Sequence, residues 1–254
     1  MSNVILVGGL DVAELAFYLF AAFFLGLIFY LRREDRREGY PREEDLTGTP
    51  LADGGIFARA TPKTFAMPFG RGTLSVPNGD RDAMPENVTA RTMPGTPFEP
   101  LGNPLTSGVG PAAYAMRADR PDVDMFNRPR IVPMRIAEHI SIEGRDTDPR
   151  GLPIAGCDHA IAGTVRDVWV DRAEHVIRYL EVALTGGGVV LVPMPVVQVT
   201  ERYIDCDAVT GAQIAGGPQL ASAEQITLLE EEKVQAYFGA GYLWATPERA
   251  EPKL

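Results

Sequence analysis

An apolar run of twenty residues, from Val12 to Leu31, is the feature that most constrains how this chain folds. Within the run only Glu14 carries a charge. Twenty helical residues span about 30 Å, the thickness of a bilayer's hydrocarbon core, and a helix satisfies its own backbone hydrogen bonds there. Asp11, just before the run, and Glu14, three positions later, are typical of a helix N-terminus. The sequence therefore predicts one membrane-spanning helix.

Seven consecutive charged residues, RREDRRE at 32–38, follow the apolar run directly, whereas residues 1–11 contain no Lys or Arg. Because positive residues gather at the cytoplasmic end of membrane helices, the N-terminus is expected to be periplasmic and the rest of the chain cytoplasmic. A secretory signal peptide would have the reverse order of charge. Gly39 and Pro41 are expected to end the helix. The membrane-boundary arginines are Arg32, Arg33, Arg36 and Arg37.

The next segment is unusually rich in Pro and Gly. Residues 41–110 contain ten of each among seventy positions, more than twice the average share of about 12%. The segment nevertheless keeps apolar side chains that a solvated linker lacks, so an extended strap over another protein's surface is favoured over a disordered linker. These side chains are Ile56, Phe57, Phe65, Met67, Phe69, Leu74 and Phe98.

Composition and motifs exclude several functions. The formal net charge of −10 argues against a nucleic-acid partner, which would require clustered Lys and Arg. Cys157 and Cys206 are interpreted as reduced core thiols, because their spacing matches neither a disulfide framework nor a metal site. The three histidines are not spaced as metal ligands, and no phosphate-binding loop or nucleophile motif is present. We therefore predict neither a metal site nor an independent enzyme.

After DPRGLP at 148–153, the sequence pattern changes to short runs rich in residues that favour β-strands. The Gly186-Gly187-Gly188 triplet is interpreted as a hairpin loop rather than a phosphate cradle. Several short strands in about fifty residues predict a small barrel or a strongly curled sheet. The candidate strands are Gly163–Val170, Val176–Leu184, Val189–Val192 and Val196–Arg202.

A C-terminal helix is predicted after these strands. Ser222 and Gln225 match a capping box, and Gly239 and Gly241 are expected to end the helix. The run Glu230-Glu231-Glu232 is interpreted as a solvated helix face.

Arg178 allows two interpretations. It shares strand parity with Leu180, Val182 and Leu184, so it could face inward and pair with Asp171 or Glu174. It could equally be an exposed arginine on a sheet edge.

Several stretches resemble one family in order and with compatible spacing. They are YLRREDRREGYP (30–41), PKTF (62–65), GRGTLSVP (70–77), GNPL and VGPAAYA (within 102–115), DPRGLP (148–153), VRDVWVDRAEHVIRYLEVAL (165–184) and ITLLEEEKVQAYFGAGYLWATPERAE (226–251). The chain thus resembles the H subunit of the purple-bacterial photosynthetic reaction centre. The resemblance implies a single transmembrane α-helix plus a mainly-β cytoplasmic domain, a PRC-type small barrel, with a short C-terminal helix.

This resemblance also implies a division of the chain and a set of partners. The periplasmic N-terminus would cover 1–11, the membrane helix with its cytoplasmic extension 12–38, the strap 39–115 and the PRC-barrel domain 116–254. The chain would bind no cofactor; the L and M subunits would carry bacteriochlorophyll, bacteriopheophytin, quinones and non-haem iron. Membrane lipid, the light-harvesting antenna and a bound cytochrome subunit are further expected contacts, in the bacterial inner (intracytoplasmic) membrane.

As function, the resemblance implies capping and stabilising the L and M subunits and delivering protons to the secondary quinone during light-driven electron transfer. Residues that match the family's proton path are Asp124 and Glu174, with Asp171 and Arg178 as electrostatic neighbours and Asp122 as a weaker candidate. Some members carry histidines where this chain has Phe126 and Arg128, so no metal site is expected there. The alternative is a membrane-tethered PRC-barrel adaptor that docks on another membrane complex.

Overall fold

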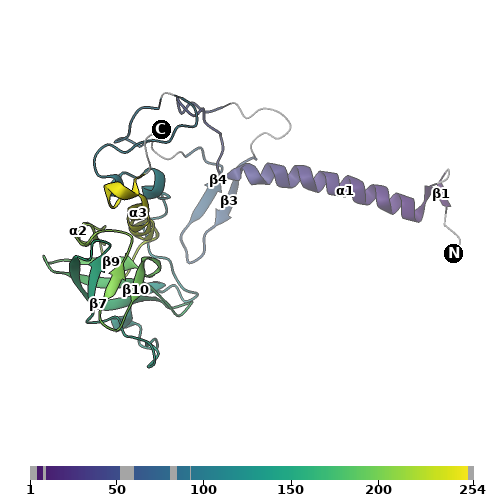
Figure 1. The fold of residues 1–254 in the computed structure, drawn as a ribbon. Helices are drawn as coiled ribbons and strands as arrows, with labels where there is room; N and C mark the ends of the chain where they lie inside the picture. Colours follow the sequence, from purple (N-terminus) through teal and green to yellow (C-terminus); the bar gives the residue numbers. More distant parts are fainter. Residues whose placement is uncertain (1–4, 8–9, 52–59, 81–84, 92, 251–254) are drawn as a thin grey trace. The chain divides into compact units, whose positions relative to one another are not determined.

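A computed structural model of the chain describes residues 5–7, 10–51, 60–80, 85–91 and 93–250 (Figure 1). They form two compact units, one within residues 1–82 and 92–95 and the other within residues 83–91 and 96–254. Ile56 and Phe57, two of the expected strap anchors, lie outside the described residues. The predicted division of the chain into strap and barrel domain stays a prediction.

The first unit contains the membrane helix. Two short strands, β1 (Ile5–Val7) and β2 (Leu10–Asp11), pair before α1 (Val12–Glu34). The side chain of Asp11 accepts a 2.8 Å hydrogen bond from the backbone N–H of Glu14, which confirms the predicted N-terminus. None of the helix is buried within the chain, and it is long and apolar enough to cross a membrane.

The helix ends close to the predicted place. A single 3-10 turn, η1 (Asp35–Arg37), follows α1, and Gly39 adopts a φ of +71°, a conformation that favours glycine. Beyond it, two short strands interrupt the Pro/Gly-rich segment. β3 (Lys63–Ala66) and β4 (Thr73–Val76) pair antiparallel as a small hairpin.

The second unit is built on a curled sheet. Its order is β10-β11-β6-β7-β8-β9, with β5 also paired to β7, and all pairs except β11 with β6 are antiparallel. The strands are β5 (Ile131–Pro133), β6 (Pro153–Gly156), β7 (Ile161–Asp171), β8 (Val176–Leu184), β9 (Val189–Pro193), β10 (Val197–Val199) and β11 (Ile204–Cys206). This arrangement confirms the predicted mainly-β barrel.

Local patterns predicted the longer strands well and the shorter ones poorly. The strand predicted over Val196–Arg202 is too long, because Met194–Val196 forms a 3-10 turn and the Thr200 hydroxyl accepts a hydrogen bond from the backbone N–H of Tyr203. The glycine triplet forms the predicted hairpin loop between β8 and β9, where the backbone N–H of Gly187 donates to the carbonyl of Leu184. The strands β5, β6 and β11 were not predicted.

Three buried carboxylates, Asp167, Asp171 and Glu181, lie in the β7–β8 pair. Glu181 accepts a 2.7 Å hydrogen bond from the indole N–H of Trp169 and pairs with Arg135, 3.1 Å away, and with Arg166. Burial of the charge raises its pKa, but the indole and the two guanidiniums together hold the pKa of Glu181 below its ordinary value. The cluster thus joins β7, β8 and the turn after β5 around one ionised carboxylate.

The C-terminal helix starts later than predicted. Two short 3-10 turns, η2 (Pro104–Thr106) and η3 (Gly110–Ala112), pack on α3 (Leu228–Trp244). The capping box is formed by Thr227 and Glu230, not by Ser222 and Gln225. The Thr227 hydroxyl also donates a 2.8 Å hydrogen bond to Asp119, so a contact distant in sequence selects this cap over the earlier one.

Gly239 and Gly241 do not end α3, which continues to Trp244. A Cβ at Gly241 would lie 2.2 Å from the carbonyl oxygen of Ala208 and 2.4 Å from a methyl group of Val209. The glycine is therefore required by close packing of the helix on the loop before α2 (Gly211–Ala215). At Gly239 a Cβ would meet nothing within 4 Å.

These two glycines give a matched test of the packing. Gly241→Ala should destabilise the chain by about 2 kcal/mol or more, because the backbone of Ala208 cannot move away easily. Gly239→Ala should stabilise it by about 0.5–1 kcal/mol, because alanine loses less conformational entropy in a helix. Urea unfolding of the full chain in detergent micelles measures both, and equal effects of the two substitutions would contradict the packing.

Candidate functional site: a carboxylate cluster around one arginine

Arg130 gathers three carboxylates from two parts of the second unit. It lies directly before β5, and its Nε atom is 2.8 Å from Asp171, the last residue of β7. One terminal nitrogen pairs with Glu174 in the turn between β7 and β8, and the other lies 3.4 Å from Asp122. The antiparallel register sets Ile131 opposite Asp171, which brings these side chains together. The cluster carries three acids and one guanidinium.

Its members differ in exposure. The side chain of Asp171 is 1% exposed, whereas that of Glu174 is 53% exposed. Asp171 also accepts hydrogen bonds of 2.8 and 3.0 Å from the backbone N–H groups of Ala173 and Glu174. Burial raises the pKa of Asp171, but Arg130 and these N–H groups hold that pKa below its ordinary value. The cluster therefore connects solvent, through Glu174, to an ionised buried acid.

Asp124 contacts residues of its own loop instead of Arg130. Its side chain is 7% exposed, 2.7 Å from the guanidinium of Arg128, and accepts hydrogen bonds from the backbone N–H groups of Phe126 and Arg128. Burial opposes ionisation, but the backbone N–H and guanidinium of Arg128 hold the pKa of Asp124 below its ordinary value. Asp124 is thus an ionised residue that also closes the 124–128 loop.

Arg178 fits its second interpretation in exposure only, because its strand β8 lies between β7 and β9 and not at an edge of the sheet. It is exposed and pairs with neither Asp171 nor Glu174, whose ion-pair partner is Arg130. The parity argument was wrong for this residue, because β8 is buried on both faces only from Tyr179 onward.

Glu231 was not predicted as a site residue, and its interpretation as part of a solvated face was wrong. It is half-buried and accepts a 3.2 Å hydrogen bond from the hydroxyl of Tyr179, which in turn accepts one from Gln235. Burial raises the pKa of Glu231, and the charge of Asp122 adds to the rise against the opposing charge of Arg178. The sequence signal for Glu231 is Tyr179 within the apolar β8 run, because a buried tyrosine hydroxyl needs a hydrogen-bond partner.

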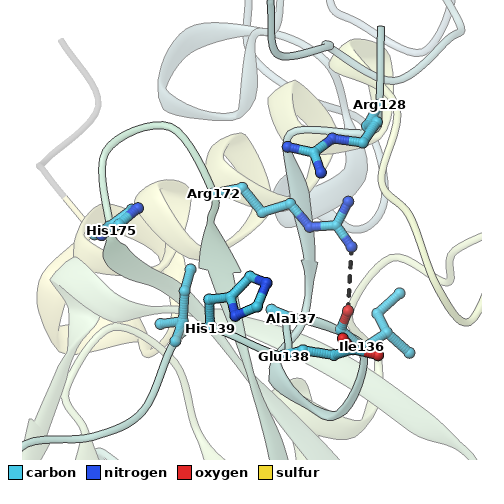
Figure 2. A pocket seen from close by; sticks show the side chains of 8 residues that line it. Arg128, Ile136, Ala137, Glu138, His139, Arg172 and His175 are labelled. Carbon is cyan, nitrogen blue, oxygen red and sulfur yellow. Dashed lines mark hydrogen bonds between the residues drawn. The ribbon is translucent and has the colours of Figure 1, made fainter. Parts of the chain in front are cut away.

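A cavity of about 420 Å³ lies beside the 124–128 loop, and its mixed lining includes two arginines, Arg128 and Arg172 (Figure 2). In Figure 2 the guanidinium of Arg172 points toward the carbonyl oxygen of Ile136, 3.3 Å away. Arg128 lies on the opposite side of the Arg172 guanidinium from Ile136. His139 and His175 also line the cavity and lie apart from each other. Among the residues that the structure describes, no group of three or more His, Cys, Asp or Glu is arranged to hold a metal ion.

The membrane-boundary arginines make contacts of different kinds. Arg37 binds Glu34 through two nitrogens at 2.8 and 2.9 Å. Arg32 lies 3.8 Å from Asp35, and Arg36 lies over the ring of Tyr40. Arg33 is exposed at the end of α1.

Comparison with known families agrees with this architecture. Residues 4–136 match the family described as photosynthetic reaction centre, H-chain N-terminal region, and residues 141–213 match the PRC-barrel domain. The chain belongs to the reaction-centre H-chain family. Members of this family are non-catalytic subunits of photosynthetic reaction centres, and membership implies that this membrane-anchored chain associates with the pigment-carrying L and M subunits.

Substitution of Arg130 tests the cluster. Arg130→Gln should destabilise the chain by about 3 kcal/mol at neutral pH, because Asp171 is left buried without its cation. Since folding lowers the pKa of Asp171, its stabilising contribution is present above the ordinary value of about 4 and is lost as the pH falls. The difference between wild type and variant should therefore shrink below about pH 4.

Arg178→Gln is the matched control, with the same change of charge at an exposed site, and should change stability by less than about 0.5 kcal/mol. Urea unfolding followed by the fluorescence of the two tryptophans, Trp169 and Trp244, measures both variants. A larger effect at Arg178 than at Arg130 would contradict the assignment.

Proposed function

We propose that this chain caps the cytoplasmic side of the L and M subunits, stabilises the complex and delivers protons to the secondary quinone. Reduction of a quinone by two electrons takes up two protons, while its pocket has to be shielded from bulk water. A cap that excludes water must contain its own proton path. The group of carboxylates around Arg130, with one exposed and one buried member, is the observation that supports this role.

Glu174 is the proposed point where protons join the path, because its carboxylate is exposed and shares Arg130 with the buried Asp171. Glu231 extends the path, since a carboxyl with a raised pKa exchanges protons nearer to neutral pH. Asp122 links Glu174 to Glu231 in the proposed path, because it pairs with Arg130 and its charge raises the pKa of Glu231.

Asp124 and Arg178 act mainly through charge in this proposal. Asp124, held ionised by Arg128, attracts protons toward the loop, and it takes one up only when that ion pair opens. The positive charge of Arg178 lowers the proton affinity of Glu231. Together they tune the acids rather than pass the proton between them.

The same proposal covers orientation and partners. The arginines that follow α1 favour a periplasmic N-terminus and a cytoplasmic barrel in the bacterial inner (intracytoplasmic) membrane. The strap would lie over L and M, which hold the bacteriochlorophyll, bacteriopheophytin, quinones and iron, and this chain would bind none of them itself. The light-harvesting antenna and a bound cytochrome subunit are further proposed neighbours.

The competing function is a membrane-tethered PRC-barrel adaptor on a different complex. Complexes purified through an affinity tag on this chain separate the two proposals. We expect near-infrared bacteriochlorophyll bands to co-purify in fixed ratio to the chain. A colourless preparation from phototrophically grown cells would favour the adaptor.

Proton delivery is tested by Glu174→Gln in the intact complex. The second, proton-coupled electron transfer to the secondary quinone should slow by about tenfold or more, because the exposed carboxylate of the path is lost. Flash-induced absorbance between about pH 6 and pH 9 measures the rate. Kinetics identical to wild type across that range would rule out the assigned role.

Glu201→Gln provides the control, because Glu201 is an exposed acid in the turn between β10 and β11 and its substitution makes the same change in charge. It should leave the kinetics unchanged. If both variants slow the transfer equally, the effect comes from net charge and not from the path.

Glu231→Gln should slow the transfer as well.

A further inference from the structure

The β3–β4 hairpin has two chemically different faces. Cross-strand partners project to the same face, and successive residues alternate between faces. Phe65 pairs with Leu74, and Lys63 with Val76, so these side chains share one face. The other face carries Thr64 opposite Ser75, whose hydroxyl oxygens are 3.4 Å apart, and Ala66 opposite Thr73. One face is therefore apolar and the other rich in hydroxyl groups.

The apolar face has little cover within its own unit. Phe65 is 45% exposed and Leu74 is 44% exposed, and Phe69 in the connecting loop is exposed to a similar degree. A hairpin of two strands is marginally stable in water unless another layer covers it. A surface outside the described residues of its own unit is therefore needed to complete this small sheet.

Two side chains fasten the hairpin to the end of α1. The ammonium of Lys63 lies 2.7 Å from Glu34 and 3.3 Å from the hydroxyl of Tyr30. Arg37, bound to Glu34, also donates to the backbone carbonyls of Thr61 and Val76 at 2.8 and 3.0 Å. Figure 1 accordingly shows β3 and β4 beside the C-terminal end of α1.

The attachment also sets the depth of the apolar face. Lys63 shares that face with Phe65 and Leu74, and its ammonium contacts the helix, so this face carries the link to α1. Tyr30 lies about one turn before Glu34, deeper along the apolar helix. The face is thus presented at the depth where tyrosine rings of membrane helices meet the headgroups.

We propose that the β3–β4 hairpin lies in the lipid headgroup layer beside α1, with Phe65 and Leu74 toward the acyl chains and Ser75 toward water. Aromatic and basic side chains are favoured at this depth, and cations attract anionic headgroups. Arg71 in the connecting loop lies 5.3 Å from the ring centroid of Phe69, which supplies such a pair. The inference rests on α1 as a membrane anchor and not on proton delivery, and for this one hairpin of the strap it replaces the surface of L and M by lipid.

Spin labels on the two faces test the proposal. Leu74→Cys and Ser75→Cys are each made in a Cys157→Ser background and labelled with a nitroxide, since Cys206 is buried. The complex is reconstituted into nanodiscs of phosphatidylcholine and phosphatidylglycerol. We expect collisions with oxygen relative to a water-soluble nickel chelate to be several-fold more frequent at position 74 than at position 75.

Two outcomes would overturn the proposal. Equal access of the nickel chelate to both labels would mean that the hairpin lies in water. Shielding of position 74 from oxygen and nickel alike would mean that another subunit covers the face. If Leu74→Cys does not assemble, Phe65→Cys places the label on the same face.

A variant with a weakened attachment to the helix and an absorbance control complete the test. Lys63→Gln removes one of the two attachments to the helix and should increase nickel access at position 74. The near-infrared spectrum of each labelled complex reports whether the pigmented assembly is intact. If no pigment co-purifies, the labels are read on the full chain alone in nanodiscs, so failure of the proposed function does not decide this inference.

Discussion

Burial of three carboxylates in one pair of strands is the constraint on which the second unit depends. Asp167, Asp171 and Glu181 leave water when β7 and β8 pack into the core, and an unpaired buried charge costs several kcal/mol. Arg130 and Arg135, from the segment around β5, supply most of the compensating charge. The irregular chain before the barrel is therefore held to it by electrostatics as well as by apolar contact.

In the proposed proton path, ion pairs separate the acids that stay ionised from the acid that exchanges protons. Asp171 and Asp124 are stabilised as anions by guanidiniums and N–H groups, so they provide fixed negative charge near neutral pH. Glu231 has the opposite environment, because burial outweighs its hydrogen bond and nearby cations. Fixed anions and an acid of raised pKa within one domain are what a proton path through a water-excluding cap requires. This separation follows from tertiary contacts and not from acidic composition alone.

The sequence predicts the elements that local patterns define and misses what distant contacts decide. The apolar run, the long strands β7 and β8 and the glycine loop all follow from short-range periodicity. The start of α3 does not, because both Ser222 and Thr227 fit a capping box and only the contact with Asp119 separates them. Arg130 could not be identified for the same reason: it lies more than forty positions before Glu174, and β5 is only three residues long. Gly241 was wrongly predicted to end the helix. The close neighbours that require a glycine there come from another part of the chain, so local sequence does not show them.

The contacts of Arg37 bear on how freely this part of the chain can change during evolution. Its guanidinium binds the helix through a carboxylate but holds the hairpin only through main-chain oxygens, those of Thr61 and Val76. Carbonyl groups are the same whatever side chain they accompany, so positions 61 and 76 can drift without loss of the attachment. Lysine at position 37 would keep the charge but not the planar fork that bonds to both sides at once. Selection at this joint therefore falls on the side chains that make the attachment, Glu34, Arg37 and Lys63, and not on the side chains at positions 61 and 76.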